Sequence, residues 1–260
     1  MKNNKNKEKE GSFVSHLSEL RSRLINSLIF LSILFVICYY FSDYIYGFLV
    51  EPYAEAVKDS KTERRLIFTA LQETFLTYVK VSFFSAFFFT SPIILIQIWK
   101  FIAPGLYEHE KTAIIPYMIL TPILFLLGGM LVYYLIMPLA IDFFLSFENS
   151  GASTNLPIQL EAKVNEYLSL IMKLIFAFGL SFQLPVILSL LARIGMIDSK
   201  FLKERRKYVI VIIFATAAIL TPPDPITQIG LAIPLLILYE LSIFSVKIIE
   251  KKIEQKNARY

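Results

Sequence analysis

The chain has 260 residues, of which 56% are hydrophobic, 15% aromatic and only 18% charged, with a net charge of +5 and a mean hydropathy of +0.60. Soluble domains are about 45–50% apolar and about 25% charged, so this composition argues against a soluble enzyme and against a disordered chain. A single cysteine, Cys38, excludes a disulfide framework, and the distant His16 and His109 offer no histidine cluster of metal-site spacing, so we expect neither a metal nor a cofactor.

Six apolar stretches are candidates for membrane-spanning helices, because a bilayer core requires about 20 mostly apolar residues per helix. They are residues 24–41, 74–99, 113–137, 167–192, 208–221 and 226–246. The predicted fold is therefore all-α, a polytopic integral membrane protein whose six transmembrane helices form a single domain over residues 1–260. The fifth stretch rises only ~21 Å, and the proline-rich turn after it cannot continue the helix. Either the bilayer is thinner at this helix, or additional residues at the ends of the stretch lengthen the helix.

The distribution of lysine and arginine predicts the orientation. One side of the predicted topology carries 19 of these residues and the other carries five, which places both termini in the cytoplasm. Residues 1–23 are then a cytoplasmic interfacial segment, whose leucines recur at the spacing of an amphipathic helix, and residues 247–260 are a cytoplasmic tail. The first apolar run lies too late for a secretory signal peptide, so we expect that helix to be retained. The absence of a transit peptide favours a bacterial plasma (inner) membrane, although an organelle-encoded chain would look alike.

Ionisable residues inside the apolar stretches are functional hypotheses, because charge is costly in a bilayer. Lys80 and Lys173 each follow a glutamate, Glu73 and Glu166, by seven residues, so the members of each pair share a helix face. Either the paired side chains approach each other or the lysines snorkel to the outer interface. Glu240 lies about fourteen residues into the sixth stretch, and we expect it to be paired, protonated or facing a polar cavity.

Prolines and buried amides mark irregular points of these helices. Pro92 and Pro185 remove a backbone donor and should kink their helices. Gln183, beside Pro185, and Gln228 need hydrogen-bond partners that lipid does not supply, either in this chain or on a partner helix. The outer segment 42–73 is rich in aromatic residues, so we expect it to fold as a cap over the helix ends.

Four stretches together resemble one protein family. They are His16–Leu24, Ser91–Glu110, Phe178–Val186 and Leu220–Asp224, and they span nearly the whole chain in order. The chain resembles the TatC family, the six-helix receptor subunit of the twin-arginine protein translocase. The resemblance implies binding of the twin-arginine signal peptides of folded precursors, recruitment of single-span TatA/TatB-type partners and transport driven by the proton-motive force. It also implies self-association in the bilayer and no nucleic-acid partner.

The resemblance assigns roles to individual residues. Glu19 and Glu110 occupy the positions of the family's signal-binding glutamates, and carboxylates match arginine forks through bidentate bonds. Phe101 would pack against the apolar part of the signal, and Arg21 would hold the charge balance of the site. The expected partner-helix contacts are Gln183, Thr221 and Gln228, and the expected structural residues are Pro52, Pro92, Pro104, Pro185 and Asp224. Gln183 stands where many relatives have a glutamate, so polarity is kept but charge is lost.

Two other functions fit parts of the sequence. Proline-broken helices and buried polar groups also suit a secondary transporter of a small solute, although the inverted repeat typical of such proteins is missing. A membrane-embedded enzyme would need a nucleophile–base pair, but Cys38 has no nearby histidine, and the HExxH pattern fails at His109 because no second histidine follows. We therefore expect no enzymatic activity.

Overall fold

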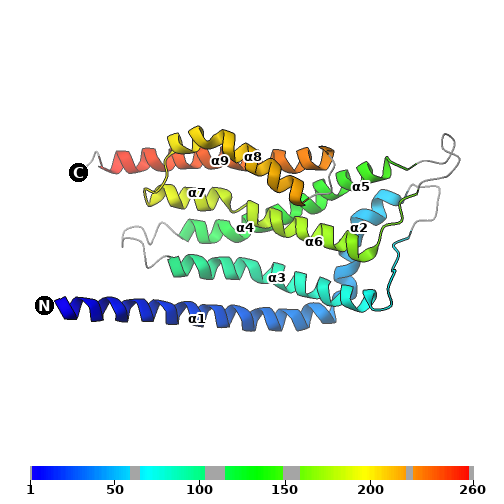
Figure 1. The fold of residues 1–260 in the computed structure, drawn as a ribbon, viewed down its shortest axis with the longest axis horizontal. Helices are drawn as coiled ribbons and strands as arrows, with labels where there is room; N and C mark the ends of the chain where they lie inside the picture. Colours follow the sequence, from blue (N-terminus) through cyan, green and yellow to red (C-terminus); the bar gives the residue numbers. More distant parts are fainter. Residues whose placement is uncertain (1, 59–64, 103–114, 149–158, 221–224, 258–260) are drawn as a thin grey trace. The chain divides into compact units, whose positions relative to one another are not determined.

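The computed structural model describes residues 2–58, 65–102, 115–148, 159–220 and 225–257, without the side chains of residues 2–17, 101–102, 226–227 and 256–257. Apart from one isolated bridge between Ile67 and Lys163, the regular elements in these ranges are helical. In chain order they are α1 (Lys2–Tyr40), α2 (Ser42–Val57), α3 (Glu73–Ile102), α4 (Ile115–Leu131), the π-helical turn η3 (Val132–Ile136), α5 (Met137–Leu145), α6 (Val164–Ser181), α7 (Leu184–Arg193), α8 (Ser199–Leu220) and α9 (Pro225–Asn257) (Figure 1).

Five helical stretches in the described ranges are long and apolar enough to cross a membrane. They are Ser18–Tyr40, Glu73–Lys100, Ile115–Leu145, Val164–Arg193 and Gln228–Gln255. The predicted class, an all-helical polytopic membrane protein, is therefore confirmed. α8 corresponds to the predicted fifth stretch, but its first turns are strongly charged, so its apolar part is limited to residues 208–220, a rise of ~20 Å.

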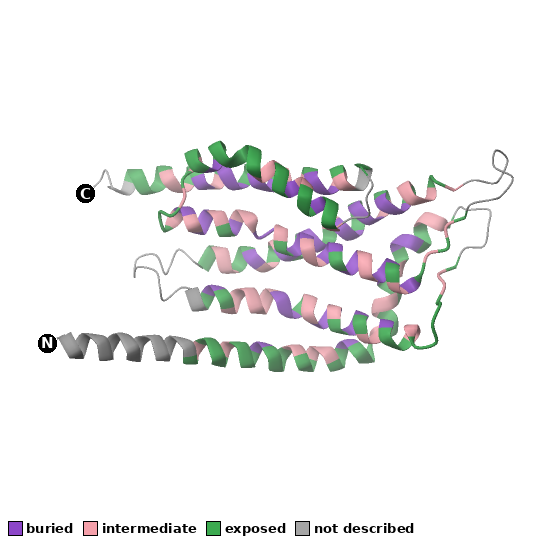
Figure 2. Ribbon diagram, viewed as in Figure 1, coloured by how far each residue is buried: buried purple, intermediate pink, exposed green. Residues whose placement is uncertain are grey.

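The chain divides into two compact units. The first comprises residues 1–45 and 79–122, and the second comprises residues 46–78 and 123–260. In the first unit α1 exposes most of its described side chains (Figure 2), and these are largely apolar, as a lipid-facing helix requires. α1 is continuous from Lys2 to Tyr40, so the predicted interfacial segment is the beginning of this helix rather than a separate one.

The second unit contains a close approach of two helices. A Cβ atom built on Gly128 of α4 would lie 2.6 Å from the carbonyl oxygen of Phe178 on α6, and one built on Gly179 would lie 2.7 Å from the ring of Phe125. Glycine at both positions thus allows the two helices to approach at backbone distance. A second cluster joins α7, α8 and α9 and consists of Ala192, Leu202, Tyr239, Ile243 and Val246.

From residue 46 on, the described part of the outer segment belongs to the second unit, and its helical part is α2. Pro52 lies inside α2, where it removes the donor that would bond the carbonyl of Phe48. The hydroxyl of Tyr133 donates to that carbonyl at 2.8 Å, and the Tyr133 and Phe48 rings stack with centroids 4.3 Å apart. The hydroxyl of Tyr167 likewise donates to the carbonyl of Leu49 at 3.0 Å. α2 can therefore contain a proline, because two tyrosine hydroxyls donate to backbone carbonyls in the turn before it.

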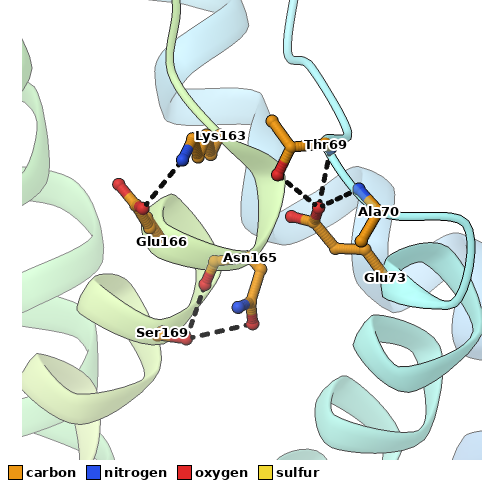
Figure 3. A network of polar contacts seen from close by, with 7 residues as sticks. All are labelled: Thr69, Ala70, Glu73, Lys163, Asn165, Glu166 and Ser169. Carbon is orange, nitrogen blue, oxygen red and sulfur yellow. Dashed lines mark hydrogen bonds and ion pairs between the residues drawn. The ribbon is translucent and has the colours of Figure 1, made fainter.

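Figure 3 shows the polar contacts at the beginnings of α3 and α6. The Glu73 carboxylate accepts hydrogen bonds from the backbone N–H groups of Thr69 at 2.8 Å and Ala70 at 3.2 Å, which ties the preceding turn to the helix start. Glu166 lies 3.7 Å from the ammonium of Lys163. Both glutamates therefore act at helix starts, where carboxylates are favoured by the helix dipole.

These contacts decide between the two interpretations of the membrane lysines. Because Glu73 and Glu166 bond toward the residues that precede their helices, they do not reach along the helix toward Lys80 and Lys173. Both lysine side chains are exposed, in agreement with snorkelling to the interface.

The two predicted proline kinks have different outcomes. α3 continues through Pro92 without a break. The fourth predicted stretch instead divides into α6 and α7 at Phe182 and Gln183. Pro185 lies in the first turn of α7, where a backbone N–H would have no acceptor within the helix, so its absence costs little. The expected kink at Pro185 is thus a two-residue interruption of the helix at Phe182 and Gln183.

Candidate functional site

A polar cluster joins α1 and α3 in the first unit. The Glu19 carboxylate accepts hydrogen bonds from two nitrogens of the Arg23 guanidinium, Nε at 3.1 Å and Nη2, and the pair forms a salt bridge one helical turn apart. The third nitrogen, Nη1, donates to the Gln97 side-chain oxygen on α3 at 2.9 Å. Arg23 therefore links the two helices while it occupies the Glu19 carboxylate.

An apolar groove of about 240 Å³ follows the same two helices. Arg23, Ser27 and Gln97 supply its polar lining, and its apolar lining consists of Leu20, Leu24, Leu28, Leu31, Phe87, Ile94 and Ile98. The Ser27 hydroxyl donates back to the carbonyl of Arg23 at 3.0 Å, so it offers little to a ligand. The groove is thus suited to an apolar segment that carries a charged or polar group at one point.

The structure places only some of the predicted recognition residues. Glu19 is half-buried in the cluster, where it pairs with Arg23, whereas Arg21 is exposed on α1. Phe101 lies in the last turn of α3, but its side chain is not described. Pro104 and Glu110 lie outside the described residues altogether. The convergence of Glu19 and Glu110 therefore stays a prediction.

Sequence reasoning missed Arg23, which binds Glu19, and Gln97, which binds Arg23. The i, i+4 spacing of Glu19 and Arg23 was a usable signal, because oppositely charged residues four apart are neighbours on a helix. Gln97 carried no such signal, since it follows Arg23 by 74 residues and becomes a neighbour only through helix packing.

The amides predicted to contact partner helices both bond within the chain. Gln183 is 2% exposed at the α6–α7 break, and its Nε2 lies 3.4 Å from the Gly179 carbonyl oxygen, a long hydrogen bond. Gln228 Nε2 donates to the carbonyl of Phe214 at 3.1 Å and so joins α9 to α8. Thr221 and Asp224 lie outside the described residues. The intrachain alternative thus accounts for the bonds that the two amides make in this structure.

Comparison with known proteins identifies the family. Residues 15–234 match the model of the family described as Sec-independent protein translocase protein (TatC). The chain belongs to the TatC family. The TatC proteins of Magnetococcus marinus and Rickettsia prowazekii are 46% identical over 251 residues and 48% identical over 239 residues, which cover 96% and 92% of this chain and 89% and 94% of those proteins.

A crystal structure of the twin-arginine translocase receptor TatC is 40% identical to this chain, covers 90% of it and 99% of that chain, and superposes with a TM-score of 0.77. Membership of the TatC family makes the chain a core receptor subunit of the twin-arginine translocase, a multi-pass protein of Sec-independent export and not an enzyme. This assignment favours protein export over the small-solute transporter.

A further ion pair of this TatC-family chain lies between α8 and α9. Arg206 Nε is 2.8 Å from Glu240 Oε1, and Arg206 Nη2 is 2.8 Å from Glu240 Oε2, so the contact is bidentate. Of the three outcomes expected for Glu240, paired, protonated or facing a polar cavity, the structure shows the first.

Proposed function

We propose that this TatC-family chain binds the twin-arginine signal peptides of folded precursors at its cytoplasmic face and recruits single-span TatA/TatB-type partners for export driven by the proton-motive force. The proposal includes a bacterial plasma membrane location, self-association, and a single domain of six transmembrane helices with α8 as the short fifth span and both termini cytoplasmic. The 19-to-5 distribution of basic residues supports this topology. A cysteine at Lys58 should accordingly be labelled from outside intact cells, and labelling only after permeabilisation would contradict the topology.

The observation that carries the proposal is the guanidinium already bound at Glu19. Two nitrogens of Arg23 donate to one oxygen of this carboxylate, Oε1, which shows that a guanidinium fits against Glu19. An incoming arginine would exchange with Arg23, which would keep its bond to Gln97. The carboxylate would then exchange one guanidinium for another, and a lysine, which has a point charge instead of a planar fork, would be a poorer replacement.

The rest of the signal site is supported by the resemblance and by the groove. Glu110 would accept the second arginine, with Phe101 against the adjoining apolar residues and Arg21 balancing the charge. The apolar groove between α1 and α3 is of the right chemistry for the apolar part of a signal. Because the recognition bonds lie at an aqueous surface, binding should weaken as salt is raised.

Crosslinking tests the signal site directly. A photoreactive residue at position 19 or 110 of the full chain in nanodiscs should crosslink to a twin-arginine peptide and much less to its twin-lysine version. The matched control is position 204, an exposed glutamate on α8. Equal crosslinking from position 204, or equal crosslinking of the two peptides, would show that the signal binds elsewhere.

For the partner helices we propose contact at Gln183, Thr221 and Gln228. The intrachain bonds of Gln183 and Gln228 would have to be exchanged for intermolecular ones, and such interhelical bonds are worth about 0.6–2 kcal/mol each. Gln183→Leu and Gln228→Leu should therefore reduce crosslinking to a single-span partner. Unchanged crosslinking in both variants would leave the two amides with a purely intrachain role.

A further inference from the structure

The first turns of α8 form a dense basic surface that signal recognition does not use. We call residues 200–208 the α8 basic segment. Its basic residues are Lys200, Lys203, Arg205, Arg206 and Lys207, and all five are exposed. One acidic residue, Glu204, lies among them, so positive charge is in clear excess.

Contacts with α9 show the level at which this segment lies. The backbone N–H of Ser199 donates to Glu250 Oε1 at 2.6 Å, and Arg206 pairs with Glu240, so α8 runs antiparallel beside residues 240–250 of α9. Over the same residues α9 still exposes large apolar side chains, with Phe244 63% exposed and Ile248 42% exposed. The α8 basic segment thus lies beside an apolar, lipid-facing surface, at the level of the headgroups rather than far out in the aqueous phase.

Nearby carboxylates neutralise only part of this charge. Glu240 binds Arg206 in bidentate fashion. Glu250 bonds the backbone of Ser199, and Asp198 accepts the backbone N–H of Phe201 at 2.6 Å, so these two carboxylates cap the beginning of α8. Within the described part of the chain the structure shows no ion pair for the other four cations of the segment, Lys200, Lys203, Arg205 and Lys207. They are therefore available to anions from outside the chain.

Aromatic rings hold two of these cations at the surface. The Arg205 guanidinium carbon lies 5.4 Å from the centre of the Phe201 ring and 5.7 Å from that of Tyr208, and Lys207 Nζ lies 5.2 Å from the Tyr208 ring. The next turns of α8 expose apolar side chains, with Val211 67% exposed. After the last cation, Lys207, come the aromatic ring of Tyr208 and then the exposed Val211, in the order in which a phospholipid presents phosphate, interface and acyl chain.

From this arrangement we infer that the α8 basic segment binds the headgroup phosphates of anionic phospholipids, while the acyl chains lie against the exposed apolar side chains of α8 and α9. Each basic residue at a membrane surface contributes about 1 kcal/mol of attraction to anionic lipid, which is about five-fold in affinity. This inference requires only that the chain spans the membrane, and it is independent of signal recognition. If the basic residues served only to orient the chain, the protein would show no preference among the lipids that surround it.

The test compares two double variants of the full chain, Lys203→Gln with Lys207→Gln and the matched control Lys58→Gln with Arg65→Gln. The control removes the same charge from two exposed residues of the outer segment, which the distribution of basic residues places across the bilayer from the α8 basic segment, farther than the Debye length of about 8 Å at physiological salt. Binding of phosphatidylglycerol relative to phosphatidylcholine is measured with a photoactivatable phosphatidylglycerol in mixed nanodiscs. The first variant should lose about 25-fold of the preference, and the control should lose little.

Several results would overturn the inference. It is wrong if both double variants keep the parental preference, or if the parental protein has none. It is also wrong if inorganic phosphate or glycerophosphate competes as well as the lipid does, because the segment would then bind a soluble anion. Mapping the crosslink in the parental protein keeps the test independent of variant folding, since the adducts should lie on α8 between residues 200 and 212, and adducts confined to other helices would contradict the inference.

Discussion

Replacing Glu19 by glutamine separates recognition from folding, because the structure predicts very different magnitudes for the two. The Glu19–Arg23 pair is one helical turn apart, with the side chains 38% and 24% exposed, so after solvent screening it contributes only about 0.3–0.5 kcal/mol to folding. A charge-assisted hydrogen bond to a ligand arginine is worth about 1.5–3 kcal/mol. Glu19→Gln should therefore weaken binding of a twin-arginine peptide by about 10- to 150-fold while the free energy of unfolding changes by less than about 1 kcal/mol.

The assay is fluorescence anisotropy of a labelled twin-arginine peptide with the full chain in nanodiscs, with thermal unfolding measured on the same preparation. Glu110→Gln should behave in the same way, whereas Glu254→Gln, which neutralises an exposed carboxylate near the end of α9, should bind like the parental chain. Raising the salt should reduce binding to the parental chain more than to the Glu19 variant. Parental affinity in both the Glu19 and Glu110 variants would refute the assignment, as would a loss of binding that merely follows a loss of folded protein.

Two further predictions concern stability and are measured by unfolding in mixed micelles. Gly128→Ala should destabilise the protein by about 1–3 kcal/mol, because its Cβ would meet the backbone of Phe178 at 2.6 Å. The control Gly230→Ala, whose Cβ would have nothing within 4 Å, should be neutral or stabilising by up to about 1 kcal/mol. Equal effects would contradict the close approach of α4 and α6. Arg206→Gln should destabilise the protein more than the double variant Arg206→Gln with Glu240→Gln does, because only the single change leaves the Glu240 carboxylate without its partner. Additive effects of the two substitutions would show that the bidentate pair contributes nothing to stability.

Several features of this chain were determined by its sequence alone. The membrane class and the main spans depend on hydropathy summed over about 20 neighbouring residues, a property that packing does not change. The expectation that Glu240 would be paired, protonated or facing a polar cavity also came from the sequence, since a carboxylate within an apolar stretch is costly whatever the fold. The TatC-family motifs are likewise read along the chain, so they point to protein export independently of how the helices pack.

Only the tertiary structure decided which residues meet. Pro52 is compatible with a helix because the Tyr133 hydroxyl, 85 residues from Phe48 in the chain, bonds the carbonyl that the proline leaves without a donor. Arg23 meets Gln97, and Arg206 rather than another basic residue meets Glu240, because helix packing brings distant turns to one level. Hydropathy describes how each helix interacts with lipid, but a hydrogen bond needs a donor and an acceptor within about 3 Å, and folding alone sets that distance.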